Sequence, residues 1–217
     1  MDRLVNEGLG EAQYAQKVSK SFKDIFEVPP ECLTHQVCVA AAASFNGYLS
    51  EIPVEYLTYE LCLAAVRRDG QSLNDVPDKW LTEEMCLAAV IRDGYALRYV
   101  PVSKQTELMQ CVAISGYADA LRWVPLDQRS EAVWQAAVSK NGFFLYQVPY
   151  EQQSDAVRLA ALREDGLALE CIDSKDRTEE MLLAAVGQNI QALNLIPVEY
   201  HASLISKCLL VDQECID

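Results

Sequence analysis

The residues that most often perform catalysis are few and dispersed in this 217-residue chain. His35 and Cys38 are three residues apart and could share a helix face, but a Cys–His nucleophile also needs a third group that orients the base. Cys208 and Cys215, together with His201, come nearest to a zinc-ligand set, which needs about four converging ligands at short spacings. We therefore expect no enzyme activity, no metal site and no organic cofactor.

Three neighbouring segments carry side chains that could bind a partner protein. They read LRYV from residue 97, LRWV from residue 121 and LYQV from residue 145. If the leucine and valine point inward, the two residues between them point at least partly outward. Arg, Tyr and Trp are the residue types most enriched at binding hot spots, although these aromatic rings could instead fill gaps between unequal repeats. The candidate anchors are Arg98, Tyr99, Arg122, Trp123, Tyr146, Tyr95 and Phe143.

Acidic residues supply a second candidate surface. The formal net charge is -14, which disfavours direct contact with nucleic acid or an anionic membrane. It permits a basic protein partner, or a decoy that occupies the nucleic-acid groove of a nuclease or regulator, as some phage-encoded inhibitors do. Helix starts also favour acids, so the same residues have a purely structural explanation. The candidate acidic stripe consists of Glu83, Glu107, Glu131, Asp155 and Glu179.

The chain as a whole is organised as a 24-residue repeat. A Val-Pro or Ile-Pro step ends each repeat, and Ile172-Asp173 replaces it once. A fixed period of 20–50 residues is typical of stacked arrays, which present extended surfaces to other macromolecules. The proline steps fall at residues 28–29, 52–53, 76–77, 100–101, 124–125, 148–149 and 196–197.

Each repeat contains the signals of one long and one short helix. A Ser or Thr followed by acids, as in Thr82-Glu83-Glu84, predicts a helix start. Glycines such as Gly94 suit the left-handed C′ position and would end the helix after about 12 residues. A leucine and, three residues later, the Val or Ile before proline predict a short α or 3-10 turn.

We therefore predict an all-α, right-handed α-solenoid of about eight units. Residues 1–29 would form an N-terminal capping unit, residues 30–197 seven tandem repeats, and residues 198–217 a C-terminal capping helix. The last helix has no short partner, so it either caps the array or leaves an apolar edge for homo-oligomerisation.

Three cysteines occupy one repeat position. Equivalent positions in stacked helices lie roughly 10 Å apart, whereas a disulfide needs Cα atoms within about 7 Å. Cys38, Cys62 and Cys86 are therefore expected to be buried thiols in a reducing compartment. With no secretory signal in the sequence, we expect a cytoplasmic protein, or one delivered into a host cell as an effector.

The repeat T-E-E-M-C-L-A-A-V-x-x-D-G-x-A-L-x-x-V-P resembles a bacterial tandem-repeat family known only as a domain of unknown function. The resemblance covers residues 30–197 and is best at residues 57–101 and 154–173. It implies a helical repeat found in host-associated bacteria, including candidate secreted effectors, and it brings no catalytic residues. The alternation of long and short helices is also similar to the leucine-rich variant repeat, although the motif differs.

Overall fold

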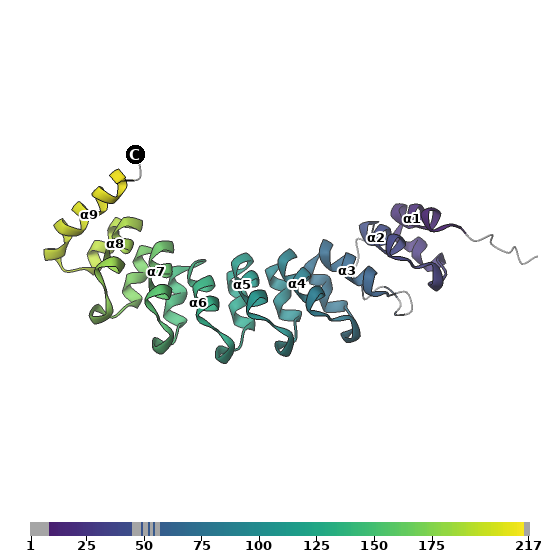
Figure 1. Ribbon diagram of the computed structural model, residues 1–217, viewed down its shortest axis with the longest axis horizontal. Coiled ribbons are helices and arrows are strands. Elements are labelled where there is room, and N and C mark those ends of the chain that lie inside the picture. The colour runs from purple at the N-terminus through teal and green to yellow at the C-terminus, as the bar shows by residue number, and fades with distance from the viewer. Residues whose placement is uncertain (1–8, 45–48, 50–51, 53, 55–56, 215–217) are drawn as a thin grey trace, which may run out of the picture. The chain divides into compact units, whose positions relative to one another are not determined.

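The computed structural model describes residues 9–44, 49, 52, 54 and 57–214, and no strand occurs among them. The chain falls into two compact units, Met1–Tyr117 (unit 1) and Ala118–Asp217 (unit 2). Both consist of α-helices in tandem, linked by 3-10 helices (Figure 1). The predicted all-α solenoid class is confirmed. The α-helices are α1 Glu11–Lys20, α2 His35–Ser44, α3 Tyr59–Arg68, α4 Glu83–Arg92, α5 Glu107–Gly116, α6 Glu131–Val138, α7 Asp155–Glu164, α8 Glu179–Gln188 and α9 His201–Glu214.

Each α-helix before α9 starts a repeat, and a six-residue 3-10 helix follows wherever the whole connection is described. Where the residues after the proline step, or after Ile172-Asp173, are described in full, a three-residue 3-10 turn follows, and the sequence predicted only a link there. The six-residue helices are η1 Phe22–Glu27, η5 Gly70–Asp75, η7 Gly94–Tyr99, η9 Ala118–Trp123, η11 Gly142–Gln147, η13 Gly166–Cys171 and η15 Ile190–Leu195. The three-residue turns are η2 Pro30–Cys32, η6 Asp78–Trp80, η8 Val102–Lys104, η10 Leu126–Gln128, η12 Tyr150–Gln152, η14 Ser174–Asp176 and η16 Val198–Tyr200.

The helix starts were predicted correctly. Each Ser or Thr hydroxyl accepts a hydrogen bond from the amide three residues later, as Thr82 does from Met85 at 3.2 Å. This bond satisfies one of the amides that the first turn leaves without a partner. The hydroxyls that cap in this way belong to Thr34, Thr58, Thr82, Thr106, Ser130, Ser154 and Thr178.

The expected role of the glycines is wrong. None of the described glycines has a positive φ. Most of the repeat's helices end after ten residues because an Asp or Asn follows in extended conformation. Asp93 has φ -150° and accepts a hydrogen bond from the Tyr95 amide at 2.9 Å, which starts η7. Gly94 is then the first residue of η7, where a Cβ would lie 2.3 Å from the Ala113 carbonyl oxygen on the next helix. Glycine is therefore required by close packing, not by its dihedral freedom.

The core of each unit is built from the repeat's apolar columns. Ala89, Leu97 and Val100 of one repeat are buried, and so are their counterparts Ala161, Leu169 and Ile172. Cys38, Cys62 and Cys86 are also buried and are not in disulfides. Burial raises the pKa of all three thiols, that of Cys62 to about 12, so they remain protonated.

Candidate protein-interaction surface

The clearest exposed cluster lies in unit 1 and comprises Tyr95, Arg98 and Tyr99 of η7 with Tyr117, the residue after α5; we name it the Arg98 cluster. Within η7, Leu97 is buried and Arg98 is exposed, while Tyr95 and Tyr99 are half-buried. Tyr117 is 37% exposed. The flanking leucine and valine thus point inward, as the sequence predicted, and leave the charged and aromatic side chains at the surface.

The guanidinium of Arg98 is held by two tyrosine rings. Its Cζ lies 5.0 Å from the centroids of both Tyr95 and Tyr99, within the range of cation–π attraction. Arg98 also donates a hydrogen bond to Tyr95 Oη. Tyr95 contacts Tyr99 edge-on at 6.4 Å between centroids, and Tyr117 at 5.8 Å. The rings therefore support one another and fix the direction of the guanidinium.

Tyr117 was not among the predicted anchors, although the sequence contains a signal for it. In five other repeats its column holds Asp or Asn, such as Asp93 and Asn141, which cap the following 3-10 helix. A tyrosine cannot cap in this way, so its presence marks a departure from the repeat's structural rule.

Unit 2 carries the remaining predicted anchors. Arg122 of η9 is exposed and Trp123 is half-buried. On η11, Phe143 is 38% and Tyr146 is 85% exposed. A pocket of about 290 Å³ lies beside them, and Phe144 lines it where most repeats have a small residue. The lining residues are Asp119, Leu121, Arg122, Arg129, Phe144 and Gln147.

Charge is distributed unevenly along the sequence. Residues 94–150 contain five Lys and Arg residues against four Asp and Glu, whereas the rest of the chain contains 13 against 28. Every ion pair among the described residues also lies outside residues 94–150. The aromatic and arginine side chains therefore lie in a long stretch of the sequence that has no acidic excess.

The acidic stripe is exposed, but several of its members have partners within the repeat stack. Glu131 accepts a hydrogen bond from Ser154 Oγ at 2.6 Å. Glu179 pairs with Lys207, and an Asp155 oxygen lies 3.9 Å from Arg158. No partner is found in the described structure for Glu83 or Glu107. In unit 2, Glu131 and Glu179 therefore help to join consecutive helices.

The His and Cys residues form no cluster of three or more metal-ligating side chains in the part of the chain that the structure describes. Cys38 is buried, with its sulfur 3.3 Å from Thr58 Oγ1, whereas His35 is exposed. The ring of His201 lies 2.9 Å from the Ile196 carbonyl oxygen. Cys215 lies outside the described residues.

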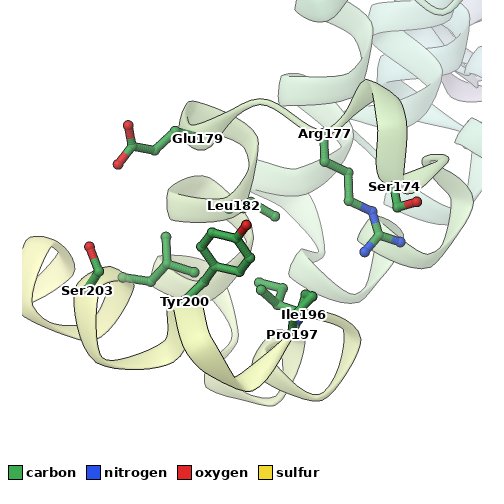
Figure 2. Close-up of a pocket in the computed structure, with 9 residues that line it drawn as sticks. Ser174, Arg177, Glu179, Leu182, Ile196, Pro197, Tyr200 and Ser203 are labelled. Atoms are coloured by element: carbon green, nitrogen blue, oxygen red, sulfur yellow. The ribbon is translucent and has the colours of Figure 1, made fainter.

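A pocket of about 560 Å³ in unit 2 lies between the start of α8 and the start of α9 (Figure 2). Arg177 and Glu179 lie on opposite sides of the Tyr200 ring. The Arg177 guanidinium donates to the carbonyl oxygens of Ile172, Leu169 and Leu195 at 2.7–3.0 Å. With Glu179 bound to Lys207, both charged groups of this pocket have structural roles.

The structure contains no helix among its described residues that is long and apolar enough to cross a membrane. A family described as a domain of unknown function (DUF4116) matches residues 58–103, about two repeats. No curated protein and no solved structure matches the chain. The comparisons therefore agree with a helical repeat of unknown function and add no site residues.

Proposed function

We propose that this protein is a non-enzymatic interaction module, an adaptor, inhibitor or effector-type scaffold that binds a partner protein. The Arg98 cluster carries this proposal. It joins an exposed arginine to three tyrosines in a fixed arrangement, and such residues dominate the binding energy of interfaces.

The fold does not need this cluster. The equivalent helix η5 has Gln71, Asn74 and Asp75 in the columns of Tyr95, Arg98 and Tyr99, yet it forms the same six-residue 3-10 helix. Its Leu73 and Val76 are buried like Leu97 and Val100. The side chains of Tyr95, Arg98 and Tyr99 are therefore not required for this 3-10 helix to form, and they are available to bind a partner.

Affinity capture with the full chain, followed by binding measurements on the captured protein, tests the proposal. We expect Arg98→Ala combined with Tyr99→Ala to weaken binding by about 2 kcal/mol or more. Tyr146→Ala tests the unit 2 anchors in the same way. Tyr200→Ala is the control, because Tyr200 is a tyrosine that is 53% exposed and lies outside both groups. If all variants bind like the wild type, these anchor residues are wrong.

The second candidate function is an acidic decoy that occupies a nucleic-acid groove, of the kind that phages or mobile elements use against host defence. The exposure of all five residues of the acidic stripe favours it. A decoy contact should weaken steeply between low and moderate salt, because charge attraction is screened over about 8–10 Å at physiological salt. DNA or RNA should also compete with it. The affinity of an interface anchored by aromatic side chains should change little with added salt or with competing DNA or RNA.

The repeat motif also leads us to propose an origin in a host-associated bacterium. Location in the bacterial cytoplasm and delivery into a host cell are both compatible with this proposal. Fractionation of the native host, with antibodies against the chain, would distinguish them.

A further inference from the structure

We propose that the Arg98 cluster binds a carboxylate side chain of an acidic peptide segment in the partner protein. This inference rests on the proposed interaction function and specifies the chemistry of the partner at this site. It differs from the basic partner that the net charge of the whole chain suggests, because residues 94–117 of unit 1 contain two basic residues and only one acid.

The first argument is that most N–H donors of the Arg98 guanidinium have no acceptor among the described residues. A guanidinium has five N–H donors in a planar fork. Among the described residues the only hydrogen bond of Arg98 goes to Tyr95 Oη, and no carboxylate pairs with it. Most donors of an exposed, positioned guanidinium are thus free to bind an anion.

The second argument is the position of Arg98 in a chain rich in acids. Two other exposed arginines form ion pairs with carboxylates of their own chain: Arg67 pairs with Glu84 at 3.1 Å, and Arg163 pairs with Glu180 at 3.8 Å. Arg98 lies instead in residues 94–117 of unit 1, where Arg98 and Lys104 stand against a single acid, Glu107. Residues 94–117 would therefore repel an acidic segment less than the acidic remainder of the chain would.

The third argument is the tyrosine support. Two rings at 5.0 Å hold the guanidinium, so less side-chain entropy is lost when a ligand binds. The exposed part of Tyr117 extends the surface with an aromatic ring that an apolar neighbour of the carboxylate could contact. The site therefore fits a short peptide with an Asp or Glu beside an apolar residue.

Selection of random peptides of about 12 residues on the immobilised full chain tests this assignment. We expect the selected peptides to be enriched in Asp and Glu. For a selected peptide, Arg98→Gln should weaken binding at least about tenfold, as should replacement of the peptide's Asp or Glu by Asn or Gln. The two changes together should cost little more than either alone, which identifies a direct pair.

Arg98→Lys should recover only part of the affinity, because lysine lacks the planar fork. Arg163→Gln is the control and should bind like the wild type. Selected peptides that bind the wild type and Arg98→Gln equally would overturn the assignment and leave the proposed function standing. A single-stranded DNA of about 12 nucleotides that binds through Arg98 more tightly than the peptides would overturn it in favour of phosphate. If no peptide is selected and no partner is captured, both the carboxylate assignment and the proposed interaction function are overturned.

Discussion

At the scale of single residues, the glycines of the repeat are constrained by a carbonyl oxygen of the next repeat. A Cβ added at Gly94 would lie 2.3 Å from Ala113 O, and one added at Gly166 would lie 2.2 Å from Ala185 O. Both obstacles are backbone atoms, which cannot move aside as the end of a flexible side chain can. Consecutive repeats therefore approach as closely as the absence of a side chain permits.

We expect Gly94→Ala to lower the free energy of unfolding by about 2 kcal/mol or more, because the new methyl group forces the two backbones apart. Gly187→Ala is the matched control. Gly187 lies in α8, and a Cβ there would meet nothing within 4 Å. Alanine favours helix over glycine, so this variant should be unchanged or more stable by up to about 1 kcal/mol. Urea denaturation followed by circular dichroism measures both, and equal effects would contradict the explanation.

The buried thiol of Cys62 makes stability depend on alkaline pH. Burial raises its pKa from an ordinary value near 9 to about 12 in the folded state. The unfolded chain therefore loses this proton first. The stabilisation is fully present below about pH 9 and is lost as the pH rises toward 12.

We expect the free energy of unfolding to fall between about pH 9 and pH 11 under reducing conditions, and to fall less steeply in Cys62→Ala. Comparing the variant with the wild type separates this thiol from other groups that titrate at high pH. A native-state reaction with a thiol reagent at pH 8 should also leave Cys62 unmodified. Parallel pH profiles for the two proteins would show that Cys62 is not the group responsible.

At the scale of elements, one column of polar side chains completes the 3-10 helices. Residues in this column donate to the carbonyl oxygens that precede each proline step: Gln105 to Val100, Arg129 to Leu121 and Val124, and Gln153 to Leu145 and Val148. Arg177 reaches further, because it also donates to Leu195 O of the following repeat at 2.7 Å. Earlier repeats have leucine in this column, as at Leu57 and Leu81.

Arg177→Ala should lower the free energy of unfolding by about 2 kcal/mol or more, because it leaves three carbonyl oxygens without their donor. Arg177→Gln should lower the free energy of unfolding by less, because Gln105 and Gln153 donate to the equivalent carbonyl oxygens in their own repeats. Thermal unfolding of the wild type and the two variants measures their order of stability. A Gln variant as unstable as the Ala variant would mean that packing of the arginine, not its hydrogen bonds, is what matters.

The helix starts could be predicted because their chemistry is local: a hydroxyl such as that of Thr82 bonds an amide three residues away. The inward direction of Leu97 and Val100 followed from their spacing in the same way. The glycine contacts could not be predicted, because the Ala113 oxygen belongs to the next repeat. The rings around Arg98 depend on side-chain conformations that spacing does not determine. The spacing of the residues thus predicts which of them are exposed, and the structure shows which exposed side chains contact one another.

At the scale of the whole molecule, the net charge of -14 is carried by residues 1–93 and 151–217, since residues 94–150 have a small positive excess. Like charges at this density repel one another and oppose folding. The ion pairs in these segments are largely exposed, such as Arg67–Glu84 and Lys175–Asp173, and exposed pairs stabilise proteins little. Repulsion should therefore outweigh attraction in the folded chain.

We expect the midpoint temperature of unfolding to rise by a few degrees when NaCl is raised from about 20 mM to about 500 mM, because salt screens the repulsion. Glu151→Gln combined with Glu170→Gln removes two exposed acids that form no ion pair among the described residues. This variant should start from a higher midpoint at low salt and gain less from added salt, which separates screening of these charges from general effects of salt on hydrophobic burial. A midpoint that falls with salt would mean that the ion pairs contribute more than the repulsion, and the acidic segments would then stabilise the fold instead of opposing it.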